Sequence, residues 1–152
     1  MHKKKTAAVA AFLAGCATAP APVVLTSPQT LDDYKRGVAK RIAAATGSTY
    51  SAPVPEMLKS IVVLEITLDK AGAPLEVTVF RTNGYPALAQ RALTSVVDAA
   101  PYATPSPVLL QGAGTVSFLE TFLFRDDDTF QVRSLVADSW KSSITSPPAS
   151  TD

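Results

Sequence analysis

Three adjacent carboxylates, Asp126, Asp127 and Asp128, form the densest group of side chains in the chain that could bind a cation. A hard ion such as Ca²⁺ prefers oxygen ligands, but calcium loops space them at alternate positions and add a glycine and a bidentate glutamate. Both additions are missing here, so the spacing favours a solvated turn whose charges discourage edge-to-edge aggregation. We expect neither a metal nor a non-covalent cofactor.

Cys16 and His2 are the only cysteine and histidine among the 152 residues, and both lie near the N-terminus. Three lysines at positions 3 to 5 precede an apolar stretch over residues 6–13, which is the pattern of an export signal. Eight to ten apolar residues at ~1.5 Å rise each cover about half of a ~30 Å hydrocarbon core, so the stretch is too short to span a bilayer. We therefore expect it to be cleaved.

The run Leu13-Ala14-Gly15-Cys16 closes this stretch with small residues before the thiol. It resembles the lipobox of bacterial lipoproteins, in which cleavage falls just before the cysteine and the thiol carries a diacylglycerol. The resemblance implies that residues 1–15 are a signal peptide and that the covalent lipid on Cys16 anchors the protein in a membrane. Ala17 stands where Asp would retain a lipoprotein at the inner membrane, which implies the outer membrane of a Gram-negative bacterium, facing the periplasm. An ordinary secreted protein with a stray thiol is the alternative.

Loss of residues 1–15 would leave a chain with no histidine and no free thiol. Sites built on Ser-His-Asp or Cys-His pairs, zinc centres of the usual kind and haem ligated by His or Cys are then excluded. Ser and Lys are present, but the Ser-x-x-Lys pattern and the nucleophile elbow are not. A formal net charge of +1 gives no footprint for nucleic acid. We expect a protein that is not an enzyme and binds no nucleic acid.

Residues 16–30 are rich in proline and alanine, a composition that extends the backbone, so we interpret them as a tether. Over residues 31–45 apolar residues recur at helical intervals, with Thr30 and Asp33 placed as in a capping box. The apolar stripe consists of Leu31, Tyr34, Val38, Ile42 and Ala45. We interpret the basic remainder as a solvated helix face, with contact to anionic lipid as the alternative. Its cations are Lys35, Arg36, Lys40 and Arg41.

A β-hairpin is predicted over residues 60–68 and 75–81, joined by a turn in which Gly72 can take positive φ. Along its second strand Leu75, Val77 and Val79 alternate and should share one face. A helix then begins at Pro86, whose fixed φ suits the first helical position. Its apolar face must cover the hairpin sheet, and we interpret the neighbouring Tyr85 as a core residue.

A third strand is predicted over residues 115–125, and residues 129–135 form a candidate fourth strand. The class is therefore α+β, with two helices packed on one face of an antiparallel sheet of three or four strands, in the order α-β-β-α-β(-β). We place this domain at residues 31–137 and a flexible tail at residues 138–152, with Trp140 packed onto the domain.

The turns and the second helix carry a family resemblance. The runs Leu68–Val77, Thr82–Leu88 and Ala99–Tyr102, together with the helix around Tyr34 to Ile42, resemble the C-terminal domain of the TonB/TolA family. The resemblance covers about residues 31–125. It implies a non-enzymatic module that binds short extended segments of outer-membrane receptors or other envelope proteins through the last strand of its sheet.

An edge strand suits that role because it presents unpaired N–H and C=O groups that an incoming peptide can satisfy. The expected partner-binding residues of this strand are Val116, Phe118, Glu120, Phe122 and Phe124. A second copy of the chain, in a homodimer, is an alternative partner. If residues 129–135 fold back onto this strand, they occupy the edge that a peptide would need.

Two other roles stay open. The protein could be a structural lipoprotein subunit of an envelope complex that binds through a helix face. An accessory role in energy transduction is less favoured, because family transducers couple to a motor through a transmembrane helix, whereas this chain has a lipid and a short tether.

Overall fold

The computed structural model describes residues 29–51 and 53–136. The expected signal peptide, Cys16, nearly all of the tether, the tail and Trp140 lie outside these residues. The described elements are α1 (Leu31–Ala45), β1 (Ser60–Asp69), β2 (Pro74–Thr82), α2 (Pro86–Asp98), the 3₁₀ helix η1 (Pro107–Leu109), β3 (Thr115–Phe124) and β4 (Phe130–Val132).

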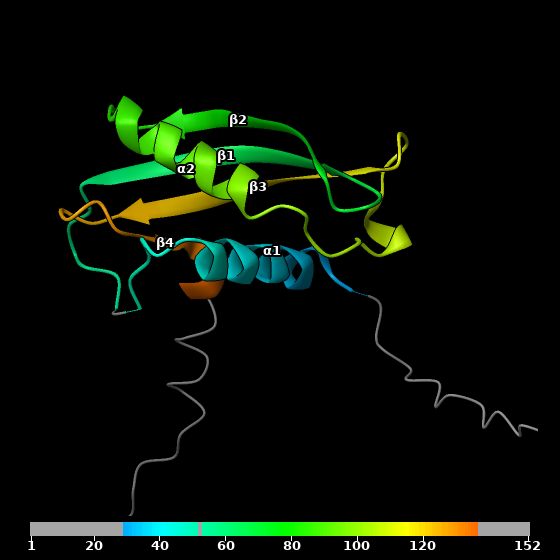
Figure 1. Ribbon diagram of the computed structural model, residues 1–152, viewed down its shortest axis with the longest axis horizontal. Helices are drawn as coiled ribbons and strands as arrows, with labels where there is room; N and C mark the ends of the chain where they lie inside the picture. Colours follow the sequence, from blue (N-terminus) through cyan, green and yellow to red (C-terminus); the bar gives the residue numbers. More distant parts are fainter. Residues whose placement is uncertain (1–28, 52, 137–152) are drawn as a thin grey trace, which may run out of the picture.

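The four strands form one antiparallel sheet in the order β2-β1-β3-β4, with α1 and α2 lying over the same face (Figure 1). The predicted α+β class is confirmed, and the candidate fourth strand forms. The described chain begins and ends on the side of α1 and β4, across the sheet from β2 (Figure 1).

Both helices begin where the sequence predicts. The Thr30 hydroxyl accepts the Asp33 N–H at 3.1 Å and the Asp33 carboxylate accepts the Thr30 N–H at 3.3 Å, which closes the capping box of α1. Pro86 occupies the first turn of α2. Leu31 is 39% exposed, since the buried stripe of α1 begins one turn later at Tyr34.

The core lies between the sheet and the two helices. Even-numbered residues of β1 and β3 face the helices and are buried, while odd-numbered ones lie on the open face of the sheet. At the β4 end, the Phe130 ring lies 5.2 Å from Phe122 and 5.4 Å from Phe124, centroid to centroid. All three side chains are fully buried, so β4 is part of the core.

The β1–β2 turn is fastened to the connection that follows α2. Gly72 has φ +82°, and its C=O accepts the Tyr102 N–H at 3.0 Å. A Cβ at this glycine would lie 2.3 Å from the Tyr102 carbonyl oxygen. The Tyr34 hydroxyl donates to the Ala103 C=O at 2.8 Å, which joins α1 to the same connection.

Candidate functional site at the two margins of the sheet

The backbone of β3 shows which groups a partner strand could reach. Phe124 O accepts from Lys59 N at 3.0 Å toward β1, and Arg125 N donates to Thr129 O at 2.9 Å on the opposite side. Because successive residues of an antiparallel strand direct their N–H and C=O groups to opposite sides, odd-numbered residues of β3 direct theirs away from β1. These outward groups form the β3 margin.

The C-terminal end of the β3 margin is closed by β4, which pairs with Phe122, Leu123 and Phe124. The outer side of β4 is covered in turn, because Tyr50 N donates to Phe130 O at 3.2 Å and Phe130 N donates to Ser48 O at 3.0 Å. A peptide therefore cannot pair here without displacing buried residues.

Glu120 closes the β3 margin at the next outward residue, Thr121. Its side chain, in a residue that is only 2% exposed, accepts the Thr121 N–H at 3.0 Å, and it also accepts the hydroxyl and the N–H of Ser134. Burial raises the pKa of the Glu120 carboxyl, and these hydrogen bonds oppose the shift. The bonds to Ser134 explain why β4 ends at Val132, short of the predicted residue 135: the chain turns into a helical turn at residues 133–136.

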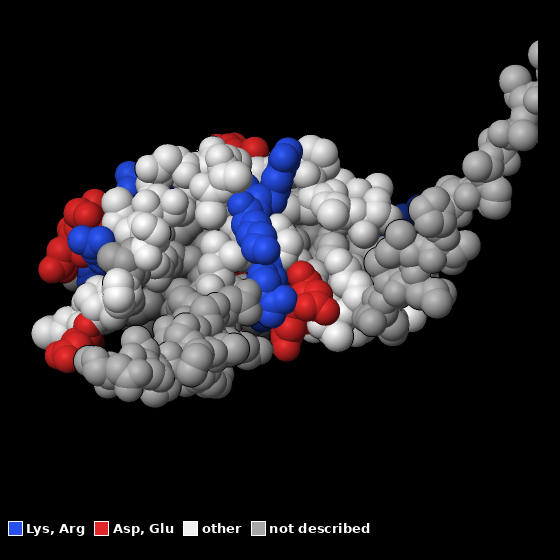
Figure 2. All heavy atoms as spheres, turned by 90° about the horizontal axis from the view of Figure 1, so that it is seen from below, with Lys and Arg blue, Asp and Glu red and all other residues white. Residues whose placement is uncertain are grey.

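Little of the β3 margin remains. Gln111 N donates to Thr115 O at 2.8 Å at the far end. Within the described residues, the outward backbone groups of Ser117 and Leu119 pair with no other strand. Beside Leu119 lies a shallow pocket of about 210 Å³, whose lining includes Lys35 and Arg133. Lys and Arg side chains form a band on this side of the molecule (Figure 2).

The side chains of the five residues expected to bind a partner face the core. Their exposed fractions are 2% for Val116, 6% for Phe118, 2% for Glu120, 0% for Phe122 and 0% for Phe124. Of β3, therefore, only backbone groups reach the margin, and partner binding by these five residues stays a prediction. The physical reason is the even-numbered register of β3, which turns the aromatic residues toward the helices.

The opposite margin, along β2, is open. β2 is the terminal strand, and no described residue pairs with its outer side. Three of its apolar side chains are exposed: Leu75 (59%), Val79 (38%) and Phe80 (60%). The expected shared face of Leu75, Val77 and Val79 is interrupted, because the register with β1 shifts at Leu75 and again at Phe80. These bulges leave Glu76–Val79 as the regular part of β2.

The pairing with β1 fixes which groups of β2 point outward. Glu76 and Thr78 lie opposite Thr67 and Glu65, odd-numbered residues of β1 whose backbone groups face β2. By alternation, Val77 and Val79 direct their N–H and C=O groups away from the sheet. We call these four groups the β2 margin.

An apolar helix flank stands beside the β2 margin. One flank of α2 faces α1 across a cavity of about 360 Å³, lined by Ala87, Arg91 and Asp98 among others. At ~100° per residue, Leu93 and Val97 lie on the opposite flank of α2. In Figure 1 that helix lies over β1 and β2, so this flank is the one on the side of β2. Leu93 is half-buried and Val97 is 56% exposed, so side chains of an added strand would find apolar contacts there.

Two polar residues organise the start of the sheet. The Asn83 side-chain oxygen accepts the Ile61 N–H at 3.1 Å and the Ser60 hydroxyl at 2.7 Å, which joins the end of β2 to the beginning of β1. The local sequence pattern around Asn83 does not predict this bridge, because it depends on which strands become adjacent. Tyr85, which we expected in the core, is 43% exposed and lies below Lys59, whose Nζ is 5.8 Å from the ring centroid.

The acidic triplet forms a turn with internal partners. Lys59 Nζ lies 2.6 Å from an Asp128 carboxylate oxygen, and Asp127 accepts from the Thr129 hydroxyl at 2.6 Å. Hydrogen bonds from Thr129 lower the pKa of Asp127. Among the residues that the structure describes, no group of three or more His, Cys, Asp or Glu side chains could hold a metal ion.

Comparisons with protein-family models, with curated proteins and with solved structures give no match to this chain. In the described residues, no helix is both long and apolar enough to cross a membrane.

Proposed function

We propose that this protein is a lipid-anchored, non-enzymatic interaction module of the periplasm that pairs the edge of its sheet with an extended segment of an envelope protein, an outer-membrane receptor being one such partner. The observation that carries the proposal is the open β2 margin. The lipobox-like run ending at Cys16 supports the anchor, and the resemblance of residues 31–125 to the TonB/TolA C-terminal domain supports the mode of binding.

The pairing edge in this proposal is β2, whereas the family resemblance implied β3. The β3 margin offers outward groups on Ser117 and Leu119 only, between the closed positions of Thr115 and Thr121. Among the described residues, none closes the β2 margin at either end. The apolar flank of α2 lies beside this margin. Main-chain hydrogen bonds would supply affinity, while contacts with Leu93 and Val97 would select apolar residues at alternate positions of the partner.

A matched pair of substitutions tests this assignment. Val79 and Leu119 are equally exposed, at 38% and 40%, and lie on opposite margins. A photo-reactive residue at Phe80 should crosslink an envelope protein in intact cells. Val79→Lys should reduce that product at least about tenfold, because a charge would face the apolar flank of α2. Leu119→Lys should leave it unchanged.

If Leu119→Lys reduces the crosslinked product and Val79→Lys does not, the partner binds at β3 and the assignment to β2 is wrong. If neither substitution changes the products, or if Phe80 crosslinks no protein partner, pairing at the sheet edge is wrong.

The basic band in Figure 2 favours one second candidate, a structural subunit that binds through α1. On α1, Arg36 forms an ion pair with Asp33 at 2.9 Å, and Arg41 donates a hydrogen bond to the Ala99 C=O at 3.0 Å. Reversing the charge of Lys35 and Lys40 would then abolish association with the complex while Val79→Lys has no effect. The edge-pairing proposal expects the reverse.

A further inference from the structure

We propose that the β2 margin is self-complementary and that, without another partner, two copies of this chain pair there as an antiparallel dimer with its two-fold axis at Thr78. The inference rests on the proposed function in one respect, since the same margin receives the envelope segment. A dimer would therefore exclude that segment, and the segment would have to displace the second copy.

The register follows from the bulges. An axis at Thr78 places Val77 opposite Val79 of the second copy, and Val79 opposite Val77 of the second copy. All four residues direct their backbone groups outward, so the two pairs form four N–H···O=C hydrogen bonds. An axis at Val77 or at Val79 would carry the pairing across the bulge at Leu75 or at Phe80. The Thr78 axis keeps both hydrogen-bonded pairs, which join Val77 and Val79, within the regular segment Glu76–Val79.

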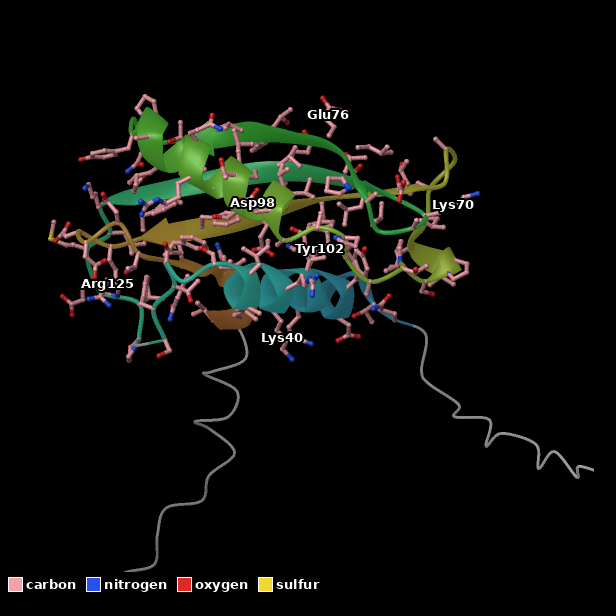
Figure 3. The ribbon with its side chains drawn as sticks, in the orientation of Figure 1. Lys40, Lys70, Glu76, Asp98, Tyr102 and Arg125 are labelled. Carbon is pink, nitrogen blue, oxygen red and sulfur yellow. The ribbon has the colours of Figure 1, made fainter. Side chains whose placement is uncertain are left out.

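The side chains suit this register. On the helix side of the sheet, the two valine pairs bring β-branched residues together and extend the apolar layer toward Leu93 and Val97. On the open face, the two Thr78 side chains meet across the axis. Glu76 lies opposite Phe80 of the second copy, so no like charges are directly opposed. Glu76 points outward from this margin in Figure 3, far from Lys40 on α1.

Geometry also limits the assembly to two copies. The β3 margin is closed by β4, Glu120 and Gln111 except at Ser117 and Leu119, so each copy has one full margin to offer. Pairing about a two-fold axis uses that margin in both copies at once. Four hydrogen bonds and a few valine contacts bury much less than the ~1,200 Å² of a standard interface, so the dimer should be weak enough to be displaced.

Disulfide trapping tests the axis. In the full chain carrying Cys16→Ala, an added cysteine is the only thiol. Thr78→Cys should form a disulfide-linked dimer at least about tenfold faster than Ser117→Cys, because paired thiols experience an effective concentration far above that in solution. Ser117 is a fair control, since it is exposed on the same open face at the other margin. Adding Val79→Lys should return Thr78→Cys to the control rate.

Sedimentation of the same purified chain, without the Thr78 substitution, should show a reversible monomer–dimer equilibrium. A monomer at every concentration, or equal trapping of Thr78→Cys and Ser117→Cys, would overturn the dimer. The proposed function fails separately: crosslinks from Phe80 to an envelope protein without a dimer would retain the module and reject only self-pairing. A dimer without any crosslink to an envelope protein would retain self-pairing and reject the proposed function.

Discussion

Gly72 is the residue at which the β1–β2 turn meets the connection after α2. Gly72→Ala should cost more than about 2 kcal/mol of unfolding free energy, since alanine at φ +82° is strained and its Cβ would lie 2.3 Å from the Tyr102 carbonyl oxygen. Urea unfolding followed by circular dichroism measures the loss. Gly47→Ala is the control, because a Cβ there meets nothing within 4 Å. Equal losses at both glycines would show that the contact with Tyr102 contributes nothing.

Glu120 should make stability depend on pH. Because burial raises its pKa in the folded protein, the folded state holds this proton more tightly than the unfolded state. Its contribution is full below the ordinary value of 4.5 and is lost as the pH rises through the folded pKa. Glu120→Gln, which keeps an acceptor for Thr121 and Ser134, should remove this loss of stability between mildly acidic and neutral pH.

The measurement is the unfolding free energy of both proteins from pH 4.5 upward. Asp33 and Asp127 have lowered pKa values, so their contributions change only at more acidic pH and leave this range clear. Parallel profiles for the two proteins would mean that Glu120 is not the group responsible.

At single residues, the sequence indicated local roles but not distant partners. The capping box of Thr30 and Asp33 and the turn at Gly72 were predictable, because each depends on neighbours within a few residues. The contact of Gly72 with Tyr102 was not, nor was the bridge from Asn83 to Ile61, because these depend on which strands become adjacent. The prediction that Tyr85 is a core residue was wrong for the same reason. An aromatic residue beside Pro86 suggests an apolar neighbour, but the folded chain places Lys59 there.

β4 is short, yet its packing fastens it to the sheet. Phe130→Ala should destabilise the protein by about 3–5 kcal/mol, since Phe130 is fully buried between Phe122 and Phe124. Phe80→Ala is the matched control on the other margin; at 60% exposure it should change stability by less than about 0.5 kcal/mol. Thermal and urea unfolding of the two variants provide the comparison.

Hydrogen exchange adds an element-level readout. In Phe130→Ala the amide of Leu123 should lose protection, because it faces β4, while that of Ile66 in β1 should keep it. A small loss of stability with Leu123 still protected would mean that β4 is held by its backbone and by residues 48–50 instead of by its aromatic side chain.

The elements themselves followed from periodicity, as the agreement at Leu31–Ala45 and at Pro86 illustrates. What periodicity could not supply was the irregularity of β2. A bulge is a property of two paired strands, so the alternation of Leu75, Val77 and Val79 gave no sign of the shifts at Leu75 and Phe80. The sequence did not decide whether residues 129–135 form a fourth strand. Burial of Phe130 explains why they pair with β3 and close its margin, which leaves β2 as the open margin.

For the whole molecule, attachment depends in our proposal on one side chain. Cys16→Ala should move the protein from the membrane to the soluble fraction and abolish incorporation of a labelled fatty acid, because the thiol that would carry the lipid is lost. Ala17→Asp should keep the label and shift the protein to the inner membrane. A wild-type protein that takes up no label would show that the resemblance to a lipobox is misleading.

The chain enters and leaves the described domain on the side of α1 and β4, across the sheet from β2 (Figure 1). An attachment at either end of the chain would therefore act on the side of the domain where β4 already closes the β3 margin. If the protein is anchored as we propose, the open β2 margin would lie on the side of the domain away from the attachment, where extended segments of other proteins could reach it.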